Sequence, residues 1–259
     1  MTNNTLTKTF TFGGIVFTIL AGSGFLASQA QATVITNGCA ATNQFCTLSE
    51  LYGGASIQVG DKVFSDWVVV NEAGKPVNAS DIQISGIFQD TTAPGIKINA
   101  LNGAFSVPDF SSLFYDFDFK VTSLGPLIKD FSLRLPTDGY TLNGLGTISI
   151  VEIVGTTCGS DNLGGGIIDV GSTGLEVTGE FTPQQMVCVR KSIFISNINL
   201  PGEGFPPIGI TMIEQRFSQV PEPNSTLSLL ALGTLGAAST LKRKLKPSQS
   251  SEKETRKVG

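Results

Sequence analysis

Two aspartates on one predicted strand are the residues of this chain best suited to bind a ligand. Asp116 and Asp118 lie two positions apart, and since side chains alternate between the faces of a strand, both point to the same side. Carboxylate oxygens are the ligands that calcium prefers. Asp116 and Asp118 are therefore calcium candidates. The competing interpretation is that they belong to the solvated outer face of a sheet.

The residue types of the chain exclude the commonest catalytic arrangements. There is no histidine, so Ser-His-Asp and Cys-His catalysis are excluded. The run Gly164-Gly165-Gly166 precedes Ile-Ile-Asp-Val, not Lys and Ser or Thr, and we interpret it as a flexible connection rather than a phosphate-binding loop. We predict no catalytic residue and no cofactor. A secreted glycan-active enzyme stays an alternative, because two carboxylates that face each other across a cleft cannot be recognised in a sequence.

Aromatic side chains are the candidates for a sugar-binding surface. Tyr52, Trp67, Tyr115 and Tyr140 are the residues to consider. Trp67 cannot share a strand face with Phe64, three positions earlier, unless a bulge intervenes. Tyr115 lies on the apolar face of its predicted strand. Core packing is the favoured interpretation for each ring, and a carbohydrate-binding module is the alternative.

The elements that must position these residues are strands. Apolar and polar side chains alternate most clearly over residues 113–121, the pattern of a half-buried strand. Turn residues such as Pro94-Gly95 and Asn102-Gly103 separate further β-rich runs. These runs cover residues 63–70, 82–88, 96–100, 128–135, 147–154, 175–181, 186–195 and 208–217. The pattern predicts an all-β fold, an antiparallel β-sandwich of jelly-roll type, for residues 33–219.

Cysteine usage indicates an oxidising compartment. Cys39, Cys46, Cys158 and Cys188 all lie within this segment. An even number in an exported chain favours disulfides, and three pairings are possible. We favour Cys39–Cys46, which closes a tight loop, and Cys158–Cys188, which could join two neighbouring strands. A four-thiolate zinc site and free buried thiols are the alternatives, although the chain lacks both Cys-x-x-Cys and histidine.

The N-terminus has the pattern of a secretory signal peptide. Lys8 is followed by an uncharged apolar stretch, residues 10–26, and then by Ala30 and Ala32 in a small-x-small cleavage site. We predict a signal helix in residues 1–32 that is removed by the secretion machinery, which leaves Thr33 as the first mature residue. An uncleaved membrane anchor is the alternative.

Charge is distributed unevenly along the chain. Residues 33–219 hold nine basic and eighteen acidic residues, a net charge of −9, whereas the whole chain has a net charge of −4. The remainder of the chain holds eight basic residues, seven of them after position 241, and three acidic residues, which gives it a net charge of +5. The acidic segment disfavours nucleic acid as a partner.

The C-terminus combines three features in a fixed order. A short motif is followed by an apolar run and then by a basic cluster. These are Val220, Pro221, Glu222 and Pro223; residues 227–241; and Lys242, Arg243, Lys244 and Lys246. The prolines exclude helix before the apolar run, which we predict to be a single transmembrane helix. The basic cluster should remain cytoplasmic as a stop, followed by a disordered cytoplasmic tail at residues 247–259.

This C-terminal order resembles the PEP-CTERM sorting signal over residues 220–246. The resemblance implies an exosortase-type membrane protease that recognises the Pro-Glu-Pro element and processes the protein at the membrane. It also implies a link to exopolysaccharide and the extracellular matrix. The segment 54–64, the Tyr-x-Phe-x-Phe strand and residues 213–217 look like a module found in cyanobacterial proteins with this signal, and that module implies no activity.

Together these patterns predict an exported, noncatalytic protein of the cell surface or extracellular matrix. It would be anchored in the membrane by its C-terminal helix before processing and would lie at the cell surface or outside the cell afterwards. The carbohydrate-binding module and the glycan-active enzyme are the two alternative functions.

Overall fold

The computed structural model describes residues 33–41, 44–88, 92–159, 163–171, 174–202 and 204–220. Every strand pair in these ranges is antiparallel, and the strands form sheets of seven, six and three strands. Buried apolar residues of the two large sheets belong to one core cluster, as in a β-sandwich. The predicted all-β antiparallel fold is therefore confirmed.

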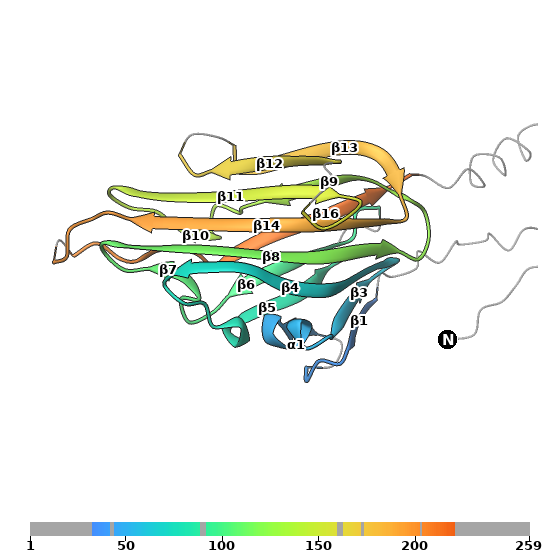
Figure 1. Cartoon of the computed structure of the whole chain (residues 1–259), viewed down its shortest axis with the longest axis horizontal. Coiled ribbons are helices and arrows are strands. Elements are labelled where there is room, and N and C mark those ends of the chain that lie inside the picture. Colours follow the sequence, from blue (N-terminus) through green and yellow to red (C-terminus); the bar gives the residue numbers. More distant parts are fainter. Residues whose placement is uncertain are drawn as a thin grey trace, which may run out of the picture. The chain divides into compact units, whose positions relative to one another are not determined.

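The seven-stranded sheet, sheet A, can be followed in Figure 1 from β12 near the top to β1 near the bottom. In spatial order its strands are β1 (Val34–Asn37), β3 (Ser56–Val59), β4 (Lys62–Gly74), β8 (Ser111–Ser123), β14 (Met186–Asn197), β11 (Gly146–Gly155) and β12 (Gly164–Asp169). The long strands β4, β8, β14 and β11 are neighbours and form its centre.

The six-stranded sheet, sheet B, lies against the inner face of sheet A. In spatial order its strands are β13 (Glu176–Gln184), β9 (Ile128–Arg134), β16 (Met212–Gln219), β6 (Gly95–Ala100), β5 (Ile82–Ile87) and β2 (Phe45–Thr47). A small third sheet contains β10 (Tyr140–Thr141), β15 (Ile208–Ile210) and β7 (Phe105–Val107). A jelly roll has eight strands in two sheets, so this sandwich is larger, and the jelly-roll topology stays a prediction.

Helical structure is minor in the described part of the chain. The α-helix α1 (Leu48–Tyr52) begins with a capping box, in which Thr47 and Glu50 satisfy each other's backbone N–H groups. A single 3-10 turn, η1 (Ala79–Asp81), precedes β5. Leu48 and Leu51 of α1 are buried in the core, so the helix covers apolar surface near β2 and β5.

The predicted strand over residues 113–121 lies within β8, and its two faces are as expected. Leu113, Tyr115, Phe117, Phe119 and Val121 are all buried. The other face of β8 is mostly half-exposed. The alternation arises because the apolar face packs on sheet B, whereas the half-exposed face lies toward solvent.

Trp67 joins this core through a β-bulge. The pairing of β4 with β8 shifts between Ser65 and Val68, and Asp66 within the shift has a φ of 54°. The extra residue turns Trp67 to the same side as Phe64, and both are buried. The Trp67 ring stacks on Phe119 with centroids 4.4 Å apart. The bulge that allows Phe64 and Trp67 to share one face of the strand is therefore present.

The interpretation of Gly164-Gly165-Gly166 as a flexible connection is wrong. These residues begin β12 and pair with Val154, Ile153 and Glu152 of β11. A Cβ atom on Gly166 would lie 2.0 Å from Cγ1 of Val177 in β13. Glycine is needed here because the edges of the two sheets approach closely.

Two disulfides join the cysteines in the predicted pairs. Cys39–Cys46 links residues 7 apart with Cα atoms separated by 5.2 Å. Cys158–Cys188 links residues 30 apart with a Cα separation of 5.0 Å and fastens the segment after β11 to β14. The structure therefore selects disulfides over the zinc site and over free thiols.

The predicted terminal helices lie outside the described residues. This applies to the signal helix of residues 1–32 and to the transmembrane helix of residues 227–241. Within the described ranges, no helix has the length and apolar character needed to span a membrane.

Candidate functional site

The described domain begins and finishes at the same end of the sandwich. The Val220 N–H donates to the carbonyl of Leu127, 3.0 Å away, directly after β16. The Thr33 carbonyl accepts from Gly60, 3.1 Å away, two residues before β4. A hydrogen bond from the first residue of β4, Lys62, to the last residue of β16 brings these two places together. The segment that leads to the predicted sorting motif therefore leaves beside the N-terminal segment.

Lys62 holds the last residue of β16 in place. Its side chain is fully buried, and Nζ donates to Asp61 Oδ2 at 2.6 Å, Gln219 Oε1 at 2.8 Å and Ser123 Oγ at 3.1 Å. Burial lowers the pKa of Lys62, and the neighbouring Asp61 carboxylate opposes this effect. Because Lys62 belongs to sheet A and Gln219 to sheet B, this cluster ties the two sheets together one residue before the sorting motif.

The motif residues themselves are mostly outside the described part. Val220 is described, whereas Pro221, Glu222 and Pro223 are not. The predicted basic stop, Lys242, Arg243, Lys244 and Lys246, and the predicted cleavage residues Ala30 and Ala32 also lie outside it. The structure thus establishes where the motif is attached to the domain.

Asp116 and Asp118 share the outer face of β8, and Asp118 is engaged by an arginine. Arg190 on β14 donates from Nε to Asp118 Oδ1 at 2.8 Å and from its second terminal nitrogen to Oδ2 at 2.9 Å. The hydrogen bonds from Arg190 raise its pKa. The Asp118 side chain, which these hydrogen bonds engage, is only 9% exposed. The calcium interpretation stays a prediction, and it requires a cation to displace Arg190.

Asp116 has a different environment. Its Oδ1 atom is buried and has no hydrogen-bond partner. Among the residues that the structure describes, no group of three or more His, Cys, Asp or Glu side chains is placed to hold a metal ion. Within the described ranges, Asp116 and Asp118 therefore do not form part of a larger acidic cluster suited to a metal ion.

The four aromatic candidates pack in or against the core. Trp67 and Tyr115 are buried, and Tyr52 and Tyr140 pack on the core cluster. The hydroxyl groups of Tyr52 and Tyr115 are 2.7 Å apart, and burial raises the pKa of both. The predicted core role is thus confirmed, and none of the four forms an exposed row.

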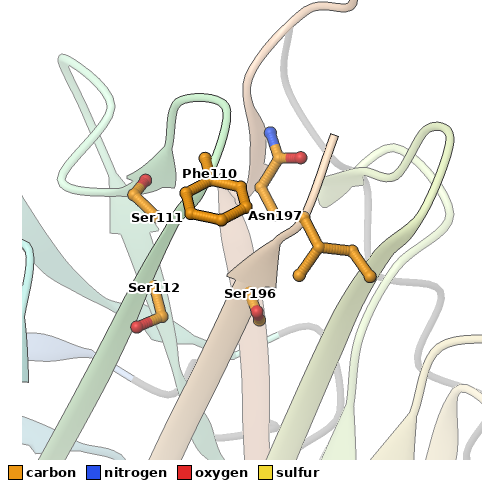
Figure 2. Close-up of a pocket in the computed structure, with 6 residues that line it drawn as sticks. Phe110, Ser111, Ser112, Ser196 and Asn197 are labelled. Atoms are coloured by element: carbon orange, nitrogen blue, oxygen red, sulfur yellow. The ribbon is translucent and has the colours of Figure 1, made fainter. Parts of the chain in front are cut away.

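An aromatic residue outside the predicted candidates is exposed at the end of sheet A opposite to Val220. Phe110 is 72% exposed, directly before β8, and has a φ of 53°. Figure 2 shows its ring beside a hollow whose other residues come from β8 and from the end of β14. The hollow has a volume of about 190 Å³ and is lined by Phe110, Ser111, Ser112, Ser196, Asn197 and Ile198.

The polar groups of this hollow have different roles. Asn197 is fully buried, accepts from the Asn199 N–H at 3.1 Å and donates to Asp109 at 3.4 Å, so its amide fixes the loops. Ser112 and Ser196 are a cross-strand pair on β8 and β14 and supply hydroxyl groups. A ring beside hydroxyl groups is suited to a small ligand with one apolar and one polar side. The sequence signal that could have indicated the exposed position of Phe110 is the turn at Pro108 and Asp109, which places its ring outside the strand.

A second hollow lies on the outer face of sheet B and is charged. It has a volume of about 270 Å³ and is lined by Ser132, Arg134, Glu176, Glu214 and Arg216. Arg134 and Arg216 each approach the Glu214 carboxylate, at 3.7 and 3.8 Å, and Ser132 donates to Glu176 at 3.0 Å. Glu176 and Glu214 stand on β13 and β16 with β9 between them. The two arginines and the two glutamates of this hollow therefore offset each other's charge.

The comparisons with known proteins identify the C-terminal segment. Residues 219–244 match the PEP-CTERM protein-sorting motif. The chain is thus a sorted, exported protein that carries a signal for exosortase-type processing at the membrane. No curated protein matches the chain. The resemblance noted in the sequence is confirmed for this motif.

Two solved structures are similar to part of the domain at a low level. One is the Glycosylation Associate Protein (Gap123) complex from Streptococcus agalactiae, at 11% identity and a TM-score of 0.27, covering 57% of this chain and 26% of that chain. The other is TmCBM61 in complex with beta-1,4-galactotriose, at 9% identity and a TM-score of 0.23, covering 60% of this chain and 86% of that chain. This chain spans about a quarter of the length of the first. These scores are too low to support an argument about function.

Proposed function

We propose that this protein is a noncatalytic component of the cell surface or extracellular matrix, which is delivered through the secretion machinery and sorted by an exosortase-type protease. The observation that carries this proposal is the attachment of the sorting motif directly to the folded sandwich at Val220. The two disulfides support it, because disulfides persist in exported proteins.

The position of the motif sets how the domain is presented. Seven residues lead from Val220 to Leu227, where the predicted membrane helix begins, and they reach at most about 25 Å when extended. The strand β8 has 13 residues and is about 43 Å long. Before processing, the end with Val220 would therefore lie near the membrane, and the end with Phe110 would point away from it.

The experiment that tests sorting is mass spectrometry of the protein from cells that express an exosortase. We expect a mature N-terminus at Thr33 and loss of the segment after the Pro-Glu-Pro element. The variant Glu222→Ala should keep residues 227–259 and stay in the membrane fraction, whereas the control Pro247→Ala, beyond the basic cluster, should be processed normally. Recovery of wild-type protein with both original termini would refute the proposal.

Carbohydrate binding is the second candidate function, and the hollow at Phe110 is the observation that favours it. The C–H face of a sugar ring packs on an aromatic ring, while its hydroxyl groups exchange hydrogen bonds with side chains such as Ser112 and Ser196. The volume of about 190 Å³ is below the roughly 300 Å³ of pockets for drug-sized ligands, so one sugar unit at a chain end or branch is the fitting ligand class.

Titration calorimetry with exopolysaccharide fragments from the producing cells tests this second function. Phe110→Ala should reduce affinity by about tenfold or more, since an aromatic contact contributes roughly 0.5–1.5 kcal/mol beyond its area. Phe205→Ala is the matched control, because Phe205 is also exposed but does not line the hollow. Equal affinity of both variants, or absence of binding by the wild type, would remove the hollow as a sugar site.

The glycan-active enzyme is tested at the charged hollow of sheet B. Its two carboxylates, Glu176 and Glu214, stand on backbones two strand spacings apart, about 9.6 Å, which is just beyond the roughly 6.5–9.5 Å that separates the carboxyl groups of inverting hydrolases. Arg134 lies on the strand between them. Release of reducing ends from the same polysaccharide, abolished by Glu176→Gln, would establish an enzyme and overturn the noncatalytic proposal.

A further inference from the structure

Three polar side chains meet in the middle of the apolar core. Lys191 of β14, Glu152 of β11 and Gln215 of β16 are all buried, with exposures of 0%, 1% and 0%. Lys191 Nζ contacts Glu152 Oε2 in a short ion pair and donates to Gln215 Oε1 at 2.9 Å. Gln215 Nε2 donates to Glu152 Oε1 at 2.9 Å. Each of the three groups therefore contacts the other two.

The cluster is surrounded by apolar side chains on both sheets. Phe117 of the neighbouring strand β8 lies opposite Lys191. Ile96 of β6 and Leu133 of β9, the two neighbours of β16, lie opposite Gln215. The preceding and following inward residues on the three strands are apolar and buried: Ile150, Val154, Val189, Ile193, Ile213 and Phe217. A charged pair in such surroundings loses its hydration, and it is seldom more stable than an apolar replacement. An amine, a carboxamide and a carboxylate in mutual contact are also the components of an amide-transfer reaction.

We propose that Lys191 and Gln215 join in an intramolecular isopeptide bond, with Glu152 as the proton carrier and ammonia as the leaving group. The bond would connect β14 of sheet A to β16 of sheet B. No oxidant and no further reactant is required, because one carboxamide is exchanged for another.

The amine and the carboxamide are already in hydrogen-bond contact. Nζ of Lys191 is 2.9 Å from Oε1 of Gln215, and the carbon to be attacked is one bond of about 1.23 Å beyond that oxygen. Once Nζ and Cδ lie about 3–3.5 Å apart in a fixed orientation, such a reaction gains an effective molarity on the order of 10⁵ M or more. Burial lowers the pKa of Lys191, although Glu152 opposes this effect, and thereby favours the neutral amine that acts as the nucleophile.

The protons balance through Glu152. A proton first passes from the Lys191 ammonium to Glu152 Oε2, and the free Nζ electron pair forms a bond to Cδ of Gln215. Glu152 then protonates Nε2, which already donates a hydrogen bond to this carboxylate, and takes a proton from Nζ. The Cδ–Nε2 bond breaks, the carbonyl re-forms and ammonia leaves. The products are a secondary amide and a protonated Glu152, so no charge remains buried.

The cluster at Lys62 provides a comparison within the same chain. Lys62 Nζ also donates to a glutamine of β16, Gln219, at 2.8 Å, and contacts a carboxylate, Asp61. In the described part of the chain, however, the Gln219 amide donates no hydrogen bond to Asp61, and the Asp61 side chain is 25% exposed. Among the described residues, the leaving nitrogen therefore has no proton donor, and we expect Lys62 and Gln219 to stay unlinked.

The consequence of the bond depends on the proposed function. If the processed C-terminus is attached to the cell surface or matrix, force on the protein enters the sandwich through β16. A covalent bond from Gln215 to β14 would pass this force to sheet A, which the two disulfides do not do, since neither involves β16. The bond itself is independent of sorting and can be tested separately.

Mass spectrometry of the exported protein tests the proposal. We expect the intact mass to be lower than that of the disulfide-bonded chain by one ammonia. Trypsin should not cleave after the acylated Lys191, so residues 191–216 should appear as one internally linked peptide, while cleavage after Lys62 proceeds. A full intact mass in the folded wild type, with release of residues 192–216, would overturn the proposal.

Two variants test the roles of the residues. Lys191→Arg keeps a cation opposite Glu152 but lacks the nucleophilic amine, and should retain its full mass. Glu152→Gln keeps the shape of the side chain but carries no proton between the two nitrogens, and should also retain its full mass while circular dichroism reports a folded sheet. Loss of ammonia in folded Glu152→Gln would refute the role of Glu152, and loss of ammonia in Lys191→Arg would refute the bond.

Discussion

Removal of the disulfide Cys158–Cys188 should destabilise the domain more than removal of Cys39–Cys46. The first closes a loop of 30 residues and the second a loop of 7. A cross-link restricts the unfolded chain, and the chain-entropy estimate is about 3.6 kcal/mol for the longer loop and about 2.4 kcal/mol for the shorter. Each pair has one buried member, Cys188 and Cys46, so the loss of packing is similar in the two variants. The expected difference is about 1.2 kcal/mol.

Urea unfolding of the two double alanine variants measures this difference. Trp67 is the single tryptophan of the chain and is buried against Phe119, so its fluorescence reports loss of the core. At an m-value of about 2 kcal/mol per M, the midpoint of Cys158→Ala/Cys188→Ala should lie about 0.6 M below that of Cys39→Ala/Cys46→Ala. The unfolding of reduced wild type should match a variant that lacks both pairs. Equal midpoints or the opposite order would refute the loop-length reasoning.

Three further predictions concern single side chains. Arg190→Met leaves its nearly buried partner, Asp118, unpaired and should lower the free energy of unfolding by about 1–3 kcal/mol. Lys120→Met removes an exposed ion pair and should change the free energy of unfolding by less than about 1 kcal/mol. Similar urea midpoints for the two variants would contradict a stabilising role of the two hydrogen bonds from Arg190 to Asp118. Gly166→Ala places a Cβ atom 2.0 Å from a valine and should cost about 1–3 kcal/mol, while at Gly174→Ala the nearest atom, a backbone oxygen, lies 3.8 Å from the new Cβ and the change should be near neutral. No difference in thermal unfolding would show that the sheet edges adapt. Hydrogen bonds from the backbone N–H groups of residues 40 and 47 lower the pKa of Glu50 in the folded state. The stabilisation by its carboxylate is therefore present above pH 4.5 and is lost as pH falls through the folded pKa. Glu50→Gln should destabilise the domain at pH 7 and progressively less below pH 4.5, and a pH-independent effect in urea titrations would contradict this.

Local patterns were sufficient to predict most of the strands. The alternation over residues 113–121 indicates both faces of β8, because a strand that packs on one side must alternate. The predicted run 208–217 is two strands, β15 and β16, which belong to different sheets, and the alternation alone does not reveal that break. The short strands β1, β2, β3, β7 and β10 were missed, since two to four residues carry too little pattern.

The candidate sites were less predictable than the strands. Asp118 was recognised as a carboxylate on an outer face, but its partner Arg190 is 72 residues away in the sequence. Phe110 was overlooked because an aromatic residue next to a strand resembles core, and only the fold places it at an open end. The local sequence does not reveal why residues 164–166 are glycines, because their requirement for space arises from β13, a strand of the other sheet.

The sequence by itself determined that this protein carries a sorting motif, since the motif is read as a linear order of prolines, apolar residues and basic residues. It also determined the strand periodicity and the supply of cysteines, which depend on neighbours along the chain. Only the tertiary structure decided that Lys191, Glu152 and Gln215 meet, because their contacts span 24 to 63 residues and depend on the register of three strands in two sheets. A change of one residue in that register would turn each of these side chains to the opposite face.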